Sequence, residues 1–266
     1  MAGPRIVVVA GEEEIGRAAA DYTCRALERA IAERGRAHLA LTGGSSPIAL
    51  YRALGTAPFR DRLDWANVDL WWGDDRFVPF DHPESNVNLV RDTLLDPASG
   101  IAIPARNVHP FPIHEADAAG EGPAWCAARY AEQLLASLPL DGHGLPVFDL
   151  VLLGVGPDGH VLSCFPGSPL VDAPAPPVCA GVPAPATAEP HVPRVTCSPR
   201  LTENARDVLV VVTGAGKSPI VAAVLAGPRN PHQYPSQLAA REGATWLLDP
   251  SAAAGLPEAM RGGRGA

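Results

Sequence analysis

Residues 38–54, HLALTGGSSPIALYRAL, are the stretch that decides the fold. They place an apolar run of strand length, His38–Leu41, before a glycine-rich turn and then a segment of helix length, Pro47–Leu54. An apolar strand that leads into a helix is the repeating unit of sheets with parallel strands, which are buried on both faces. This stretch therefore predicts a parallel strand, a turn and a covering helix.

The same alternation extends along the chain on both sides of this stretch. Residues 12–36 keep the helical spacing of one buried face, and their acidic start and basic end suit the helix dipole. Together the segments predict an α/β fold with a mostly parallel sheet and helices on both faces. The further strand segments are Ile6–Ala10, Val68–Trp72, Phe148–Gly154, Val208–Val212 and Thr245–Leu248, and the further helices are Asn86–Leu95, Pro123–Leu138 and Pro219–Leu225.

The 266 residues are expected to form one α/β domain over 1–266, because no domain boundary, charge block or extended repeat interrupts the pattern. The segment Asp172–Pro193 is rich in proline and alanine. We expect it to be a long surface excursion with a short edge strand near Pro177–Val182. The glycine- and arginine-rich tail from Arg261 onward is expected to fray.

Composition limits the classes of partner and the compartment. Twenty-one basic side chains stand against 29 acidic ones, with a net charge of −8, which argues against a nucleic-acid backbone or an anionic membrane as partner. No stretch approaches the roughly 18 apolar residues of a membrane span, and the N-terminal apolar run is too short for a signal peptide. Five scattered cysteines without a CxxC pair indicate reduced thiols in a cytoplasmic protein, for which we expect a monomer.

Ligands of an open parallel sheet bind at the carboxyl ends of the strands, so the residues that follow each strand carry the functional argument. After His38–Leu41, two glycines allow close backbone approach, and Ser46 is expected to cap a helix that begins at Pro47. Such a helix start can bind an anion, most naturally phosphate; the alternative is an ordinary glycine-rich turn with a serine cap. The candidate binding residues are Thr42, Gly43, Gly44, Ser45 and Ser46.

Two further strand ends carry ionisable side chains. Asp74 and Arg76 follow Val68–Trp72, and such crowding indicates either a bound ligand or an ion pair that satisfies itself. His160 follows the strand near residue 150 and lies two residues beyond Asp158. A carboxylate in that position can fix the tautomer of a general base; the alternative is a structural histidine.

The strand Val208–Val212 ends in the sequence TGAGKS at 213–218, which is similar to the end of a nucleotide-binding loop. That motif needs glycine at Val211, so a nucleotide site is rejected. What remains is a second strand–turn–helix unit with Lys217 at the helix start, where a cation opposes the helix dipole. A bound phosphate explains this lysine better than helix stability does.

Other classes of site lack their motifs. The eight histidines show no HExxH or paired metal spacing, so no metal site is expected. The chain has no GxSxG of a serine hydrolase, and its GVG at 154–156 lacks the third glycine of a dinucleotide fingerprint. We therefore expect no cofactor.

The ordered set of these strings resembles the 6-phosphogluconolactonase family over nearly the whole chain. The resemblance implies a doubly wound α/β fold shared with sugar-phosphate isomerases and CoA transferases. It also implies hydrolysis of a small sugar-phosphate lactone, 6-phospho-D-glucono-1,5-lactone, to 6-phosphogluconate in the oxidative pentose phosphate pathway. The strings are LTGGSSP at 41–47, WGDDRFVP at 72–79, SN at 85–86, LGVGPDGHVLS at 153–163, FPG at 165–167, RVT at 194–196, GK at 216–217, YPSQL at 234–238 and WLLD at 246–249.

The resemblance also implies roles for single residues. His160 matches the base that activates water, and Arg76 would lie near the substrate. The residues that would hold the phosphate are Gly44, Ser45, Arg194 and Lys217.

A lactone carbonyl is already electrophilic, so its hydrolysis needs no covalent nucleophile and no metal. It needs a poised water, a base and stabilisation of the developing oxyanion. We expect His160 to take the proton, Asp158 to orient the imidazole or a substrate hydroxyl, and Arg76 to stabilise the oxyanion. Asp74 is expected to bind sugar hydroxyls.

Two alternatives stay open at this point: a glucosamine-6-phosphate deaminase/isomerase, which shares the turn and the DGH loop, and a non-catalytic sugar-phosphate sensor. The deaminase has a carboxylate where this chain has Phe165 and a tyrosine where it has Arg76, and both differences favour the lactonase. Two positions depart from the lactonase pattern. Cys164 replaces an aliphatic residue and is expected only to pack, while Asp75 replaces a glutamate and would loosen any support of Arg76.

Overall fold

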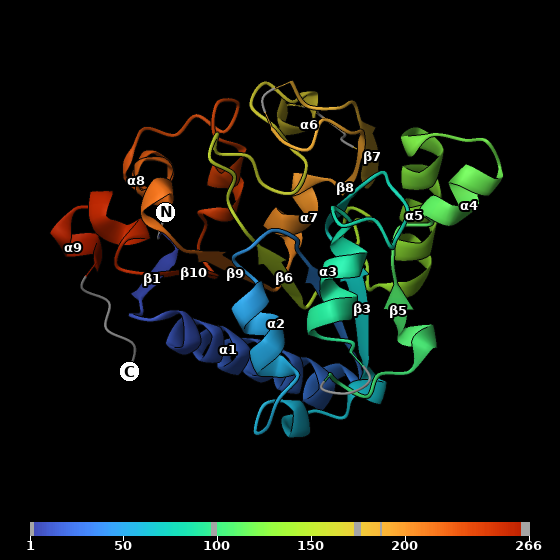
Figure 1. The fold of residues 1–266 in the computed structure, drawn as a ribbon, viewed down its shortest axis with the longest axis horizontal. Coiled ribbons are helices and arrows are strands. Elements are labelled where there is room, and N and C mark those ends of the chain that lie inside the picture. Colours follow the sequence, from blue (N-terminus) through green and yellow to red (C-terminus); the bar gives the residue numbers. More distant parts are fainter. Residues whose placement is uncertain (1–2, 97–99, 173–176, 187, 262–266) are drawn as a thin grey trace.

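A seven-stranded parallel sheet forms the centre of the computed structural model, which describes residues 3–96, 100–172, 177–186 and 188–261 (Figure 1). The strand order is β1-β10-β9-β6-β2-β3-β5, and every neighbouring pair runs parallel. The predicted doubly wound α/β sheet is thus confirmed. The strands are β1 (Arg5–Val8), β2 (Ala37–Leu41), β3 (Val68–Trp72), β5 (Val108–His109), β6 (Leu150–Leu153), β9 (Asp207–Val212) and β10 (Ala244–Leu248).

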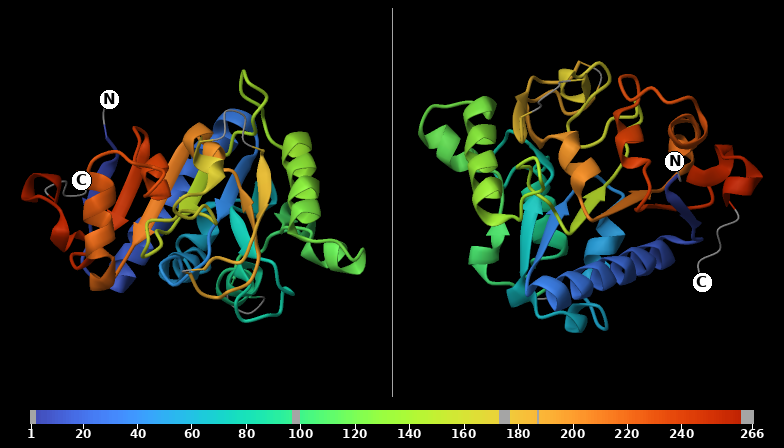
Figure 2. Two further views of the ribbon diagram at one scale, coloured as in Figure 1. Left: turned by 90° about the horizontal axis from the view of Figure 1, so that it is seen from above. Right: turned by 180° about the vertical axis from the view of Figure 1, so that it is seen from behind.

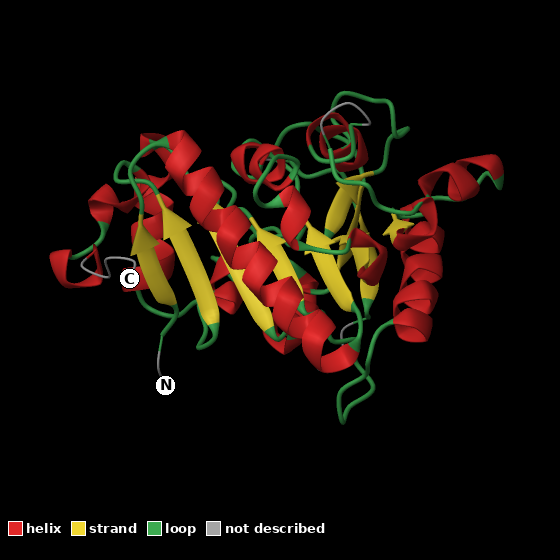
Figure 3. Ribbon diagram, turned by 90° about the horizontal axis from the view of Figure 1, so that it is seen from below, coloured by secondary structure: helices red, strands yellow, loops and turns green. Residues whose placement is uncertain are grey.

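Helices cover both faces of this sheet. The long helix α1 (Glu12–Arg34) lies diagonally across one face, where it contacts β2, β6, β9 and β10 (Figure 3). Helices α7 and α8 lie on the other side of the sheet (Figure 1). The helices after α1 are α2 (Ile48–Leu54), α3 (Asn86–Thr93), α4 (Ile113–Ala118), α5 (Pro123–Ser137), α6 (Pro169–Asp172), α7 (Pro199–Asn204), α8 (Ser218–Ala226) and α9 (Glu258–Arg261).

The element boundaries follow the apolar pattern closely. Each strand and helix predicted from the sequence is present, with ends that differ from the prediction by at most about two residues. The short elements β5, α4, α6, α7 and α9 were not predicted, because two to six residues are too few to show a period. Arg261 ends α9 and does not begin the tail, and residues 262–266 lie outside the described residues. Within the described ranges, no helix has both the length and the apolar character needed to cross a membrane.

A second sheet of three antiparallel strands stands beside the first and joins β3 to the proline-rich excursion (Figure 2). Its strands are β4 (Asp74–Arg76), β8 (Arg194–Cys197) and β7 (Cys179–Val182). The edge strand β7 confirms the strand predicted in that excursion, of which residues 173–176 and 187 lie outside the described residues. Arg76 pairs directly with Arg194, so both side chains leave the same face of this sheet.

Acidic residues at the amino-terminal edge of the parallel sheet bind the basic end of α1. The three ion pairs are Arg29 with Asp207, Arg34 with Asp149 and Arg36, just beyond α1, with Asp69. Each aspartate lies at or near the start of a different strand, β9, β6 or β3. The helix is therefore held against the sheet by charge as well as by its apolar face.

We predict that Asp69→Asn lowers the free energy of unfolding by roughly 1–2 kcal/mol near pH 7, a value reduced because Arg36 is partly exposed. Burial of Asp69 opposes its ionisation, but hydrogen bonds with His109 and Arg36 outweigh burial and lower its pKa to about 2. A folded-state pKa below the unfolded-state value stabilises the fold at higher pH, and this contribution is lost as the pH falls from about 4 to about 2.

Urea unfolding of the wild type and the variant at about pH 7 and about pH 3 measures this effect. The difference between them should shrink at the lower pH. Asp117→Asn, an exposed position on α4, is the matched control and should change little at either pH. A difference for Asp69→Asn that does not depend on pH would contradict the assigned ionisation.

Candidate active site

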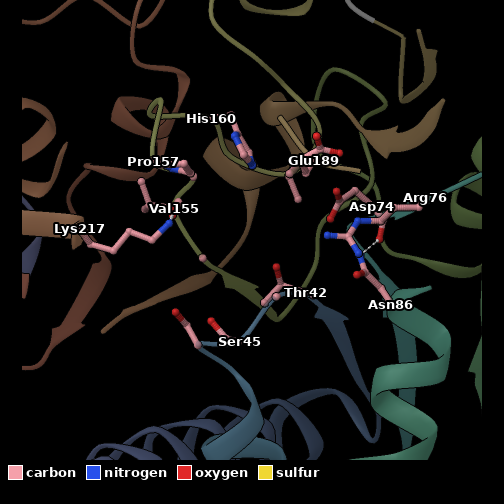
Figure 4. Close-up of a pocket in the computed structure, with 16 residues that line it drawn as sticks. Thr42, Ser45, Asp74, Arg76, Asn86, Val155, Pro157, His160, Glu189 and Lys217 are labelled. Carbon is pink, nitrogen blue, oxygen red and sulfur yellow. Dashed lines mark hydrogen bonds between the residues drawn. The ribbon is translucent and has the colours of Figure 1, made fainter. Parts of the chain in front are cut away.

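The carboxyl ends of β2 and β6 meet where the strand order reverses, since the sheet continues from β2 to β3 and from β6 to β9. The crevice outside such a reversal is where open α/β sheets bind ligands. A pocket of about 210 Å³ opens there (Figure 4). It brings together the predicted residues Thr42, Gly43, Gly44, Ser45, Ser46, Asp74, Arg76, His160 and Lys217.

The imidazole of His160 is held by Asp158, as the two-residue spacing predicts. His160 Nδ1 lies 2.5 Å from Asp158 Oδ1, which also accepts the backbone amide of His160 at 3.1 Å. Because an ionised carboxylate only accepts, Nδ1 carries the proton and the lone pair is on Nε2. Burial raises the pKa of Asp158, but the hydrogen bond from His160 outweighs it and holds the pKa below its ordinary value.

Two glycines set the position of this imidazole. A Cβ on Gly156 would lie 2.0 Å from His160 Nδ1, so no larger residue leaves room for the ring. Gly159 has a φ of +86°, and its carbonyl accepts the amide of Ser236 at 2.9 Å. Ser236 belongs to the 3₁₀ helix Pro235–Ala239, which therefore holds the loop that contains Gly159 in place.

Asp75 supports Arg76 through the main chain. Its fully buried carboxylate accepts the backbone amides of Arg76 and Asn86, each at 2.7 Å, and the hydroxyl of Ser85 at 3.2 Å. Burial raises the pKa of Asp75 to about 7, although these amides favour the ionised form. The guanidinium of Arg76 bonds elsewhere, to the carbonyl of Glu84 at 2.5 Å. Asp75 therefore accepts hydrogen bonds from the backbone and not from the guanidinium of Arg76. Its short side chain does not weaken the position of that guanidinium.

Asn86 is a pocket residue to which the sequence analysis gave no role. Its Nδ2 donates to the carbonyl of Asp74 at 2.8 Å, and it is only 2% exposed. A Cβ on Gly43 would lie 1.8 Å from Asn86 Oδ1, so the amide explains the glycine at that position. No periodicity or spacing in the sequence links residues 43 and 86, and only their adjacency in the fold reveals the pair.

Lys217 lies at the start of α8, as predicted, and is the single lysine in a chain with 20 arginines. Its Nζ donates to the carbonyl of Val155 at 2.7 Å, across the pocket from Arg76 (Figure 4). Half-burial of the amine lowers the pKa of Lys217. The single lysine of the chain therefore lies at one end of the pocket, together with the backbone amides at the start of α8.

Ser46 does not cap α2, and that prediction is wrong. Pro47 is itself the residue before the helix, its φ and ψ of −81° and −6° are already helical, and no side chain caps the helix. The amide of Ile48 instead donates to the carbonyl of Ser45 at 3.3 Å, which closes a turn ahead of the helix. The serine side chains therefore face the pocket without a capping role.

Arg194 is not among the residues that line the pocket. It is 3% exposed and lies opposite Arg76 on the neighbouring strand. Its Nη2 donates to the carbonyl of Pro190 at 2.7 Å, while its buried Nη1 has no partner among the described residues. Burial and the charge of Arg76 both lower the pKa of Arg194. An anion between these strands and the pocket would satisfy the unpaired nitrogen.

Two further side chains border His160. Glu189, from the segment between β7 and β8, lines the pocket and lies 3.0 Å from His191 (Figure 4). No sequence pattern indicates a role for Glu189, because it lies in the irregular excursion. The ring of Phe165 lies with its centre 4.8 Å from that of His160. No cluster of three or more His, Cys, Asp or Glu suited to a metal ion occurs within the described ranges.

Sequence comparison finds relatives that carry the same name. A family model described as glucosamine-6-phosphate isomerases/6-phosphogluconolactonase matches residues 10–247. A protein of Synechocystis sp. named 6-phosphogluconolactonase is 36% identical over 243 residues, which cover 91% of this chain and 93% of the relative. One of the same name from Mycobacterium tuberculosis is 37% identical over 253 residues, covering 95% and 94%.

Solved structures agree with these relatives. The 6-phosphogluconolactonase of Trypanosoma brucei superposes with a TM-score of 0.82 at 33% identity, covering 96% of this chain and 99% of that one. The enzyme of Leishmania guyanensis gives a TM-score of 0.81 at 30% identity, again covering 96% and 99%. A monomeric glucosamine-6-phosphate deaminase, 20% identical with a TM-score of 0.74 and coverage of 94% and 99%, shares the fold.

We predict that Gly156→Ala displaces the imidazole of His160 and breaks its bond to Asp158, because the added methyl would overlap Nδ1. Proton–nitrogen NMR correlations of the imidazole measure this directly. The wild type should show the proton on Nδ1, and the variant should lose that preference. Gly142→Ala, where a Cβ meets no atom within 4 Å, is the control. A wild-type ring that carries its proton on Nε2 would refute the assigned tautomer.

Proposed function

The chain belongs to the glucosamine-6-phosphate isomerase/6-phosphogluconolactonase family, and we propose that it hydrolyses 6-phospho-D-glucono-1,5-lactone to 6-phospho-D-gluconate with His160 as general base. The activity named for its relatives is a step of the oxidative pentose phosphate pathway. Their likeness to this chain extends over more than nine tenths of its length, and so over every loop that contributes to the pocket.

One observation carries the mechanism: Asp158 holds Nδ1 of His160, and the ring that bears the free Nε2 lines the pocket. A water beside Nε2 gives up a proton to it as its oxygen attacks C1 of the lactone. The tetrahedral intermediate then expels the ring oxygen, which takes the proton back from the imidazolium. The carbon–oxygen bond of the ring is broken, one from water is formed, and the product is a carboxylic acid that ionises.

Charge develops on the carbonyl oxygen during this attack and needs a fixed partner. Arg76 lines the same pocket, and its guanidinium is anchored to the carbonyl of Glu84. Because Asp75 also fixes the backbone of Arg76, little reorganisation is needed when the oxyanion forms. We therefore assign oxyanion stabilisation to Arg76.

The other end of the pocket suits the phosphate of the substrate. Lys217 and the backbone amides of residues 43–46 offer positive charge and hydrogen-bond donors there, while Arg194, buried beside Arg76 at the opposite end, does not line the pocket. None of these groups needs to contact the reacting carbon. Their binding energy instead holds C1 near His160, where it acts in both the ground and the transition state.

The surroundings of the base favour lactone hydrolysis over deamination. The resemblance places a carboxylate of the deaminase at the position of Phe165, and in this chain the centre of the apolar Phe165 ring lies 4.8 Å from that of His160. Ammonia release from glucosamine 6-phosphate, measured beside lactone hydrolysis, separates the two reactions. A non-catalytic sensor would bind 6-phosphogluconate without turning over the lactone.

The cysteines support a cytoplasmic location. All five are free and buried, and none forms a disulfide. Reduced thiols are typical of proteins that remain in the cytoplasm. We infer that the enzyme acts there, on a soluble sugar-phosphate lactone.

His160→Ala should lower kcat by roughly 10²–10⁴-fold, because the pocket then lacks the imidazole that Asp158 orients. The assay is proton release at constant pH with freshly generated lactone, corrected for spontaneous hydrolysis. His143→Ala, an exposed loop position, is the control. A His160→Ala enzyme with nearly wild-type turnover would remove the residue from this role.

Lys217→Ala should raise KM for the phosphorylated lactone by roughly 10–100-fold, the loss expected for one charged hydrogen bond, with a smaller change in kcat. Turnover of unphosphorylated gluconolactone should not change, because that substrate never used the amine. Lys217→Arg, which keeps the charge, should recover part of the affinity. An unchanged preference for the phosphorylated lactone in Lys217→Ala would contradict the assignment of this end of the pocket.

A further inference from the structure

The turn that follows the base has a backbone conformation that the mechanism above does not explain. The amide of Cys164 donates to the carbonyl of Val161 at 2.9 Å, which closes a tight turn directly after His160. Within this turn Leu162 has a φ of +55°, and it is the only non-glycine residue with positive φ in the described part of the chain. Large apolar residues avoid this left-handed region, and such outliers cluster at functional sites.

The left-handed residue directs Ser163 toward Asp74. Ser163 Oγ donates to Asp74 Oδ2 at 2.6 Å, a short bond of the charge-assisted kind. The amide of Ser163 donates to Thr196 Oγ1 at 3.2 Å. Ser163 and Thr196 are almost completely buried, at 1% and 0% exposed, so water does not replace either hydrogen bond. One residue thus joins the loop of the base to β4 and β8.

The leucine side chain explains why the turn does not use glycine at the strained position. Leu162 lines the pocket and covers Gly73, the residue immediately before Asp74. A Cβ on Gly73 would lie 2.7 Å from Leu162 Cδ2, so the leucine side chain packs closely over this glycine. The turn is therefore packed against the start of β4 as well as hydrogen-bonded to it.

We propose that this turn positions the carboxylate of Asp74 for the substrate, with Ser163 as the positioning residue. The hydroxyl of Ser163 holds Oδ2, and Asn86 holds the carbonyl of the same aspartate. Asp74 lines the pocket, and Oδ1 is left to accept a hydroxyl of the sugar ring. Because the turn that carries Ser163 begins directly after His160, it links the position of this carboxylate to that of the base. The inference rests on the proposed lactonase function.

Ser163→Ala tests the proposal in the full-length enzyme. Losing one charge-assisted hydrogen bond to Asp74 should lower kcat/KM for the phosphorylated lactone by roughly ten-fold or more. kcat/KM for unphosphorylated gluconolactone should fall as well, because the sugar ring and not the phosphate is misplaced. That pattern is the opposite of the one expected for Lys217→Ala.

A double-mutant cycle separates positioning from simple stabilisation of the fold. In an Asp74→Asn background, Ser163→Ala should cost little more, because the carboxylate it positions is already gone. Ser163→Thr, which keeps the hydroxyl, should recover activity. Thr23→Val removes a buried hydroxyl that has no hydrogen-bond partner among the described residues, and it should leave kcat/KM unchanged. Thermal unfolding of each variant confirms that folded enzyme is compared.

Two results would overturn the proposal. The first is a kcat/KM of Ser163→Ala within about two-fold of the wild type, and the second is a Ser163→Ala effect of the same size in the wild-type and Asp74→Asn backgrounds. Both require a wild-type enzyme that turns over the lactone. Failure of the proposed function has a different signature, since the wild type itself would then show no hydrolysis above the spontaneous rate.

Discussion

The parallel pairing of β2 with β6 is the constraint on which the site depends. Only two residue pairs define its register, Leu39 with Leu150 and Ala40 with Val151. Asp149 reinforces it, since its amide donates to the carbonyl of His38 at 3.0 Å and its carboxylate accepts the amide of His38 at 2.8 Å. Because both strands start from this fixed point and run the same way, the turn at residues 42–47 and the loop that carries His160 leave the sheet side by side.

The basic side chains at the two edges of the sheet have different kinds of partner. At the amino edge, arginines at the end of α1 and just beyond it are neutralised by aspartates at or near the starts of the strands. At the carboxyl edge, Lys217 and Arg194 instead donate hydrogen bonds to backbone carbonyls. The net charge of −8 thus argues against an extended polyanion as partner but is compatible with one phosphate bound beside a single cation.

The parallel sheet could be predicted because its strands are buried on both faces and show it in their composition. The small antiparallel sheet could not, apart from its edge strand β7, because β4 consists of Asp-Asp-Arg and carries no apolar signal. Its burial depends on partners outside the strand: the amide of residue 86 on Asp75, and the hydroxyl of Ser163 on Asp74. Polar strands of this kind become visible only when their partners are known.

The same limit explains what could be predicted of the site. His160 with Asp158, and Lys217 at its helix start, are local patterns within a few residues, and the structure places them as expected. Asn86 and Leu162 lie against Gly43 and Gly73 across tens of residues, so the turn pattern indicated close backbone approach at Gly43 but neither of these side-chain contacts. In the fold, these glycines are close contacts that fix side chains. The site is therefore rigid where its sequence looks most flexible, and this rigidity is what a reaction without covalent catalysis requires, because its rate depends on how well base, water and carbonyl are held in place.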